Sequence, residues 1–247
     1  MRVCIMQPYF FPYWGHFALI ARCDAWVVFD ITQFTPKSWM SRNRVLHPER
    51  GWSWIHVPLS NNSIHIRTYE ARLLDPDGAL KTIQGKLSHY RRHAPYYWVV
   101  DDLVREAFAE TRGDRSLTRL NVATLSAVCR RLDLPFRPLV CSESTLNLPS
   151  GLGAGDWALE IATRLGAIQY LNPASGAALF DPMSFAGRGI ELQFLHACGW
   201  EYETPGREFV ADLSILDALM WNDTVEVRRA LLAHSRVASA PVLLQPA

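Results

Sequence analysis

The side chains best placed for chemistry follow two apolar segments near the start of the chain. Gln7 ends the first segment, 2–7, and Asp30 follows the second, 25–29. In α/β sheets, ligands bind beyond the carboxyl ends of the strands, so we expect a site there. The loop after Asp30 adds Gln33, Trp39, Arg42, Asn43 and Arg44. Carboxylate, amide, guanidinium and aromatic groups in one crevice suit a hydroxylated or sugar-like substrate. The alternative is that Asp30 caps its own turn and pairs with Arg42.

A second polar loop, 172–176, follows another predicted strand and contains Asn172 and Ser175. It would bring backbone N–H groups and the Ser175 hydroxyl to the same mouth, as donors to a substrate oxygen. A plain turn accounts for these residues equally well.

Two histidines and a cysteine lie close to the first strands. His16 opens the helix after the first strand and faces the expected crevice. His56 sits within an apolar segment, 54–59, where a histidine is usually a hydrogen-bonded core group. Cys4 lies inside the first strand, where the default interpretation is a small buried apolar residue.

The elements that must position these residues read as one α/β domain spanning 1–247. Strand 2–7, an aromatic loop, helix 16–22 and strand 25–29 form a β-loop-α-β unit, which is typical of a sheet with parallel strands. After a polar loop, 32–43, we expect two strands at 54–59 and 64–71. Helices are predicted in a middle insertion and near the end, at 79–90, 98–110, 117–132, 155–165, 213–222 and 225–234, the last capped by Thr224. Further extended segments are predicted at 135–142, 168–171 and 191–194, which gives a mixed sheet, and 235–247 reads as a loose tail.

Composition excludes several classes of function. The net charge of +1 lacks the excess of basic residues typical of nucleic-acid binding. Five scattered cysteines without a C-x-x-C pair predict neither a zinc site nor a disulfide framework, and favour reduced thiols in the cytoplasm. No apolar run approaches the roughly 20 residues that span a bilayer, and no signal peptide is recognisable. Phosphate-loop, dinucleotide and metalloprotease motifs are missing, so we expect no metal and no bound cofactor.

Several segments of the chain carry a family resemblance. Residues 5–13, IMQPYFFPY, together with Gly15, resemble the N-terminal signature of the WbqC-like family. The likeness continues through 29–30, 39, 42–44, 57–59, 90, 94–96, 166–173, 189–191, 209 and 213–217, and so covers nearly the whole chain.

The resemblance implies a function as well as a fold. Family members occur in O-antigen and amino-sugar pathways, often beside acyl or peptidyl carrier proteins. This implies transfer of an acyl group from a carrier-protein thioester, held on a phosphopantetheine arm, to the amine of an aminosugar. The lincosamide condensing enzymes of antibiotic pathways fill a similar role, and an antibiotic-pathway enzyme of that kind is one interpretation of this chain.

Three departures from the family pattern suggest a mechanism. Positions 4, 16 and 56 are usually alanine-like, tyrosine and a small or hydroxyl residue, whereas here they are Cys4, His16 and His56. A thiol and two imidazoles near the first strands suggest a Cys–His nucleophile. In this hypothesis the thioester acylates Cys4 while His56, or His16, takes the thiol proton. Asp30, or alternatively Glu201, orients the imidazole.

The remaining steps and alternatives follow from the same residues. The Gln7 amide or a backbone N–H would stabilise the oxyanion, and the acceptor amine would then attack the acyl-enzyme. Direct transfer without an acyl-enzyme, with His56 or Asp30 deprotonating the amine, remains open, as does hydrolysis of the thioester or an amide. A non-catalytic sugar- or carrier-binding protein is the third alternative. For docking of an acidic carrier protein we expect Arg91, Arg92, Arg112 and Arg115, unless these form only a solvated surface.

Overall fold

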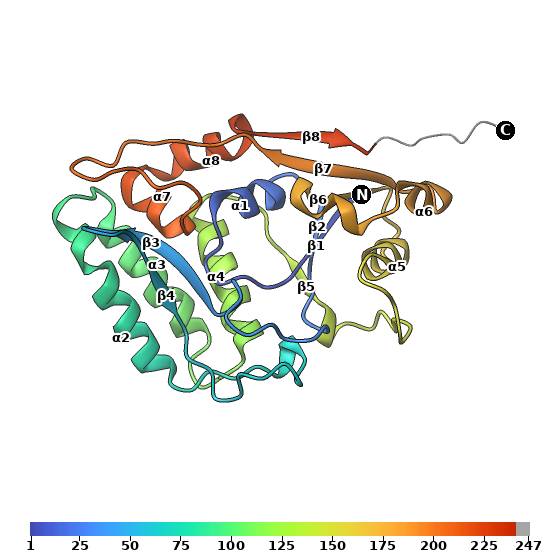
Figure 1. Cartoon of the computed structure of the whole chain (residues 1–247), viewed down its shortest axis with the longest axis horizontal. Coiled ribbons are helices and arrows are strands. Elements are labelled where there is room, and N and C mark those ends of the chain that lie inside the picture. The colour runs from blue at the N-terminus through green and yellow to red at the C-terminus, as the bar shows by residue number, and fades with distance from the viewer. Residues whose placement is uncertain (241–247) are drawn as a thin grey trace.

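The computed structural model describes residues 1–240 and confirms the α/β class with a mixed sheet. Six strands lie side by side in the order β5-β2-β1-β6-β7-β8 (Figure 1). All neighbours are parallel except β8, which runs antiparallel to β7. The strands are β1 (Arg2–Met6), β2 (Ala25–Val28), β5 (Pro138–Val140), β6 (Gln169–Pro173), β7 (Glu191–Ala197) and β8 (Ser235–Ser239).

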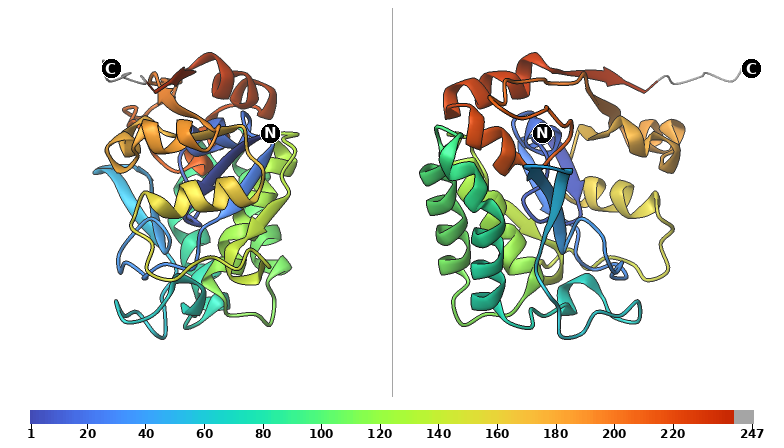
Figure 2. Two further views of the ribbon diagram at one scale, coloured as in Figure 1. Left: turned by 90° about the vertical axis from the view of Figure 1, so that its right-hand side faces the viewer. Right: turned by 60° about the vertical axis from the view of Figure 1, so that its left-hand side comes forward.

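Helices cover both faces of this sheet, which explains its apolar central strands. On one side lie α1 (Trp14–Ile20), α4 (Leu117–Arg131), α7 (Ile215–Trp221) and α8 (Thr224–Ala233), and on the other α5 (Asp156–Arg164) and α6 (Pro182–Gly187) (Figures 1 and 2). Residues alternate along β1, so Val3 and Ile5 pack with α5 and α6, whereas Cys4 packs with α1. The strand is therefore buried on both faces.

The helical insertion falls between β4 and β5, in the middle of the chain as predicted. It consists of α2 (Pro76–Leu87), a 3₁₀ turn (Ser88–Arg92), α3 (Tyr97–Glu110) and α4. The Asp75 side chain caps α2 by accepting a hydrogen bond from the Gly78 N–H at 3.0 Å. Within residues 1–240, no helix has both the length and the apolar character needed to cross a membrane.

A separate hairpin corrects the prediction for residues 32–71. The chain forms β3 (Arg42–His47) and β4 (Gly51–His56), which pair antiparallel. No strand was predicted at β3, whose first two residues fall in the predicted loop 32–43, and the strand predicted at 54–59 overlaps only the end of β4. The expected strand at 64–71 is instead a 3₁₀ turn, Thr68–Glu70, preceded by one isolated bridge between Arg67 and Gln33. The apolar pattern typical of a strand is interrupted by Arg42 and Arg44, and charged residues at such spacing are typical of a loop. In the hairpin they stack on tryptophan rings, at 4.0 Å from Trp54 and 5.3 Å from Trp52.

The C-terminal region differs from prediction in two details. Asp223, not Thr224, caps α8, since its carboxylate accepts a hydrogen bond from the Glu226 N–H at 2.7 Å. The predicted loose tail is ordered at its start, where β8 pairs with β7 over Ser235–Ser239. Residues 241–247 lie outside the described part of the chain.

A buried carboxyl joins the C-terminal helices to the insertion. Asp217 of α7 accepts hydrogen bonds from the hydroxyls of Tyr90 and Tyr202, the latter at 2.6 Å. The Tyr90 oxygen in turn accepts the Leu46 N–H at 2.8 Å. Burial raises the pKa of Asp217, and these donors oppose the rise. The carboxyl is thus used to hold α7 against β3.

Candidate functional site

The strand order places a topological switch between β1 and β6. From β1 the chain passes through α1 to β2 on one side, whereas β6 lies on the other side of β1. Loops leaving such strands separate and leave a crevice at the carboxyl edge. A hollow of about 540 Å³ lies there, the switch-point cleft, lined by Met6, Tyr9, Pro12, Tyr13, Trp14, His16, Leu19, Trp39, Asn43, Arg44, Pro173, Ser175, Ala197, Gly199, Trp200, Ala211 and Asp212.

The aromatic loop that forms one wall of the cleft is held by buried side chains from three other segments. The Asn43 amide donates to the Phe11 carbonyl oxygen at 2.8 Å, and the Ser214 hydroxyl donates to the same oxygen at 2.7 Å. The Asn121 amide donates to the Pro8 carbonyl oxygen at 2.7 Å. Phe11 adopts a left-handed backbone with φ of 38°, which these contacts maintain. The wall is therefore preorganised.

His16 is the titratable side chain most altered by its surroundings in this cleft. Its ring packs 4.9 Å from the Trp26 ring and 5.6 Å from the Tyr9 ring, and only 2% of the residue is exposed. Burial lowers the pKa of His16 to about 3, so the imidazole is neutral at physiological pH. Its Nε2 atom is buried without a hydrogen-bond partner among the described residues. The hydrogen-bonding capacity of this buried nitrogen is therefore left unfilled by the described residues, at the edge of the cleft.

The cleft lining also carries charged groups and one exposed aromatic ring, that of Trp39. The Arg44 guanidinium lies 5.6 Å from the Trp39 ring and donates to the Asp212 carbonyl oxygen at 3.1 Å. Burial raises the pKa of Tyr13, and the nearby Asp212 carboxylate adds to the rise. Trp39 is 40% exposed. The cleft thus combines aromatic walls with charges of both signs, a lining that suits a polar ring-shaped molecule.

The cleft contains four of the residues predicted to bind substrate, namely His16, Trp39, Asn43 and Ser175. Trp200 and Asp212 also line it and were missed. Both follow the last parallel strand, and only the pairing of β7 beside β6 could reveal that their loop returns to this edge.

Two other predicted residues do not line the cleft. Gln7 follows β1 directly, but Met6 and Tyr9 on either side of it form the surface. Asn172 is used within its own loop, where its amide donates to the Pro173 carbonyl oxygen at 3.0 Å and its side-chain oxygen accepts from the Tyr170 hydroxyl at 3.1 Å.

Cys4 lies in tight packing beneath α1. None of the residue is exposed, and its Sγ lies 4.0 Å from the Leu19 carbonyl oxygen. Burial, followed by the neighbouring Cys23, raises the pKa of the Cys4 thiol well above its ordinary value. A thiol that is both neutral and buried is a poor nucleophile.

The buried residue Asp30 follows β2 at the same edge of the sheet and, with Ser142, lines a separate hollow of about 280 Å³. Its carboxylate accepts the Ser142 N–H at 2.9 Å and the Ser142 hydroxyl at 2.6 Å. Both oxygens therefore hold the turn after β5, and none of the ion pairs within residues 1–240 joins Asp30 to Arg42. The capping alternative is the better description, with Ser142 in place of Arg42.

His56 and Arg42 line a third place, a hollow beside the β3–β4 hairpin that includes neither Cys4 nor Asp30. The pKa of His56 is lowered, first by burial and then by Lys86 and Arg42. The expected Cys4, His56 and Asp30 group is therefore not brought together in one hollow, because successive strand residues face opposite sides of the sheet and the hairpin lies apart from it. The thiol pathway gains no geometric support.

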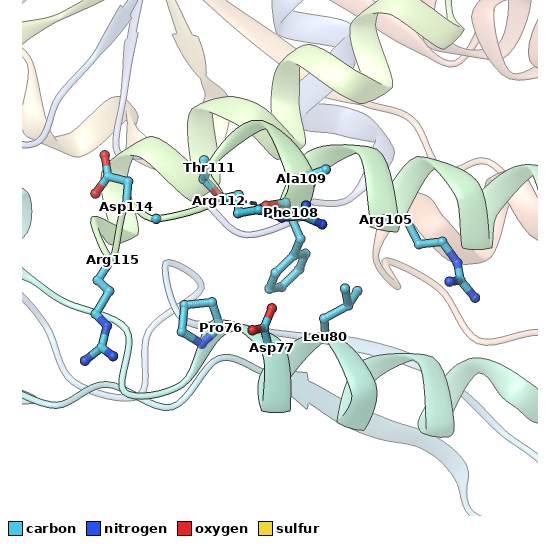
Figure 3. A pocket seen from close by; sticks show the side chains of 11 residues that line it. Pro76, Asp77, Leu80, Arg105, Phe108, Ala109, Thr111, Arg112, Asp114 and Arg115 are labelled. Atoms are coloured by element: carbon cyan, nitrogen blue, oxygen red, sulfur yellow. Dashed lines mark hydrogen bonds between the residues drawn. The ribbon is translucent and has the colours of Figure 1, made fainter.

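Another hollow, of about 410 Å³, separates α2 from α3 (Figure 3). Phe108 points toward Leu80 and Asp77 across it, whereas Arg105 and Arg115 lie at its two ends. Arg112 and Arg115, expected at a carrier-docking surface, line this hollow. Arg91 and Arg92 lie before α3 instead, beside Arg207. Since α3 spans 14 residues, about 21 Å, the four arginines form two separate surfaces.

Comparisons with known proteins match most of the length of the chain. The sequence model of the WbqC-like protein family matches residues 7–229. A relative from Mycobacterium tuberculosis (strain ATCC 25618 / H37Rv), named "Uncharacterized protein Rv1507c", is 24% identical over 219 residues, covering 88% of this chain and 92% of that protein. No solved structure matches the chain significantly.

Proposed function

Because the chain belongs to the WbqC-like protein family, we propose that it is a transferase that joins an acyl or aminoacyl group to the amine of an aminosugar-type acceptor. The acyl group arrives as a carrier-protein thioester on a phosphopantetheine arm, and an amide is formed in the cytoplasm during natural-product, antibiotic or O-antigen biosynthesis. The observation that carries the proposal is the switch-point cleft, where aromatic walls, both signs of charge and a neutral imidazole meet.

The cleft offers matching groups for an aminosugar. The exposed Trp39 ring provides a flat apolar surface for one face of a sugar ring, and the largely buried Trp200 adds apolar surface to the same lining. The Asp212 carboxylate attracts the amine while it is still protonated, and Arg44 and Ser175 offer donors to hydroxyl oxygens. These contacts orient the acceptor before reaction.

The reaction proceeds by direct transfer in this proposal. The bound ammonium first loses one proton to water. The neutral amine then attacks the thioester carbonyl carbon, a C–N bond forms, and the C–S bond breaks to release the carrier thiol. His16 accepts the amine proton and returns it to the departing sulfur. The negative charge that develops on the thioester oxygen raises the pKa of the imidazole, so proton transfer becomes more favourable as the bond forms.

The carrier docks, in this proposal, on the basic surface at the start of α3. Arg91, Arg92 and Arg207 line it with His89 and His93, and none of the ion pairs within residues 1–240 involves these arginines. Carrier proteins are typically acidic, and complementary charge speeds encounter. The double substitution Arg91→Glu and Arg92→Glu should raise the KM for carrier substrate and leave kcat unchanged. The pair Arg112→Glu and Arg115→Glu is the matched control, and equal effects of both pairs would remove this surface from docking.

The function is tested by incubating the protein with aminoacyl-loaded carrier proteins and a panel of aminosugars, followed by intact-mass measurement. The proposal expects an amide of the acyl group and the aminosugar, with no acyl adduct on the protein. Release of free acid that is unaffected by the acceptor would indicate a hydrolase. Binding of an aminosugar without turnover of any thioester would indicate a binding protein, and either result would overturn the proposal.

A further inference from the structure

The hollow beside the β3–β4 hairpin has an unusual share of the chain's lysines. Lysine occurs at three positions, 37, 81 and 86, and two of these, Lys37 and Lys86, line this one hollow of about 430 Å³. We call it the basic hollow, which is lined by Lys37, Ser41, Arg42, Trp54, His56, Val57, Pro58, Leu59, Asn62 and Lys86.

No acidic side chain among residues 1–240 forms an ion pair with the charges of the basic hollow. Its lining contains Lys37, Arg42 and Lys86 but no carboxylate. None of the three takes part in an ion pair with an acidic side chain of residues 1–240. Three like charges around one hollow repel each other, and an anion bound between them would relieve the repulsion. The lowered pKa of His56 beside Lys86 and Arg42 agrees with this positive field.

Trp54 fixes two of the cations. The Arg42 guanidinium carbon lies 4.0 Å above the Trp54 ring centre, and the Lys86 ammonium donates a hydrogen bond to the Trp54 carbonyl oxygen. The Arg42 Nε is buried without a hydrogen-bond partner among the described residues. Arg42 and Lys86 are therefore held in place, which lowers the entropy lost when an anion binds.

Lys37 occupies a backbone position that normally favours glycine. Its φ is 56°, in the left-handed region, and it follows Pro36 in a turn. Such a conformation disfavours a side chain, and strained residues of this kind gather at functional sites. A lysine at this position, in a chain with so few lysines, points to a role for its ammonium group.

We infer that the basic hollow binds the phosphate group of an organic phosphate ester, with Lys37, Arg42 and Lys86 around the phosphate oxygens. Several fixed cations suit a group with up to two charges and three free oxygens. The uncharged part of the ligand lies against the apolar wall of Val57 and Leu59. This inference does not rest on the proposed transferase function.

The basic hollow adjoins the switch-point cleft. Trp54 lines the hollow, Trp39 lines the cleft, and their ring centres are 5.6 Å apart. A phosphate ester held in the hollow can therefore extend past these two rings toward the cleft. Phosphate esters of two kinds meet this description: a phosphosugar and a pantetheine phosphate.

Calorimetric titration of the full-length protein distinguishes these sources. The probes are inorganic phosphate, glucosamine 6-phosphate, 4′-phosphopantetheine, and the last two without phosphate. We expect at least one phosphate ester to bind about tenfold or more tightly than its unphosphorylated form. The tighter of the two esters identifies the source. Binding of inorganic phosphate alone would reduce the site to a free-phosphate site, and equal affinity with and without phosphate would overturn the inference.

Two substitutions test the site without disturbing the fold. Lys37→Gly removes the ammonium and suits the left-handed backbone, so the melting temperature should stay close to that of the unaltered protein while the Kd for the ester rises about tenfold. Lys86→Met should weaken binding similarly, whereas Lys81→Met, on the exposed face of α2, should not. An unchanged Kd in Lys37→Gly with Lys86→Met would contradict the inference. Because these titrations involve no turnover, their failure is separate from that of the proposed transferase activity.

Discussion

The carboxyl edge of the sheet has two polar regions that look alike in the sequence but differ in how their side chains are hydrogen-bonded in the fold. At the β2–β5 end, Asp30 is buried and both of its oxygens accept hydrogen bonds from Ser142. At the β1–β6 boundary, His16 lines an open cleft and its Nε2 has no partner within the described residues. The hydrogen-bonding capacity of the Asp30 carboxylate is used within the fold, whereas that of His16 Nε2 is not.

The difference lies in the connections. β2 and β5 are neighbours whose following loops meet, so a side chain at the strand end is used to join them. Between β1 and β6 the loops diverge, and space remains for a ligand. A strand end is therefore a good candidate for a functional site only where the order of the strands in the sheet reverses.

The largest effect should come from His16→Gln. Glutamine retains a polar side chain but cannot accept the amine proton, so kcat/KM for amide formation should fall about 10²–10⁴-fold. Activity is measured with the carrier and aminosugar identified by intact-mass screening, and circular dichroism checks the fold. Retention of full activity by a folded His16→Gln protein would remove His16 from the reaction.

Asp30→Ala should lower the stability of the protein and leave its activity nearly unchanged. Loss of a charged acceptor for two hydrogen bonds should lower the free energy of unfolding by about 2–3 kcal/mol. Chemical denaturation measures this loss, and kcat/KM per folded molecule should remain within about threefold of the unaltered protein. A large fall in kcat at unchanged stability would mean that the β2–β5 end carries the chemistry.

The two regions should also differ in how they respond to acid. The pKa of His16 is about 3 in the folded protein and 6.5 ordinarily, so the unfolded chain binds a proton that the folded protein excludes. The stability from this group is complete above pH 6.5 and is lost as pH falls from 6.5 toward 3, by up to about 1.4 kcal/mol per pH unit. Denaturation at pH 7.5 and 5.5 should show a smaller loss in His16→Gln, and equal losses would contradict the burial of a neutral imidazole.

Cys4→Ala should have the smallest effect. Removing a buried sulfur leaves a small cavity and should cost about 1 kcal/mol of stability. The kcat for amide formation should stay within about threefold of that of the unaltered protein. Intact-mass measurement should show no acyl adduct on either protein, because direct transfer forms none. If kcat fell by orders of magnitude in a folded Cys4→Ala protein, the thiol pathway would have to be reinstated.

Local patterns were sufficient for much of the fold. Continuous apolar runs identified β1 and β2, and helical periodicity identified α2, α3 and α4 within a few residues. Strand β3 was missed because Arg42 and Arg44 interrupt the apolar pattern, and their packing on tryptophans depends on the partner strand. For the same reason β8 could not be foreseen, since its pairing with β7 is a long-range contact.

The site was only partly predictable. His16, Trp39, Asn43 and Ser175 were selected from the ends of the predicted strands and the loops that follow, and these four residues line one cleft. The same rule also selected Asp30, which is satisfied by Ser142, because residue type and position do not reveal which hydrogen bonds a side chain already makes. Cys4 was an attractive nucleophile by type, but strand alternation turns it into the packing beneath α1.

The central claim is that the acceptor binds in the switch-point cleft. A crystal structure of the full-length protein with the aminosugar selected by screening tests it most directly. We predict a sugar ring in the cleft against the Trp39 ring, with its amine within hydrogen-bond distance of His16 or Asp212. A sugar bound instead beside Asp30, with the cleft empty, would contradict it.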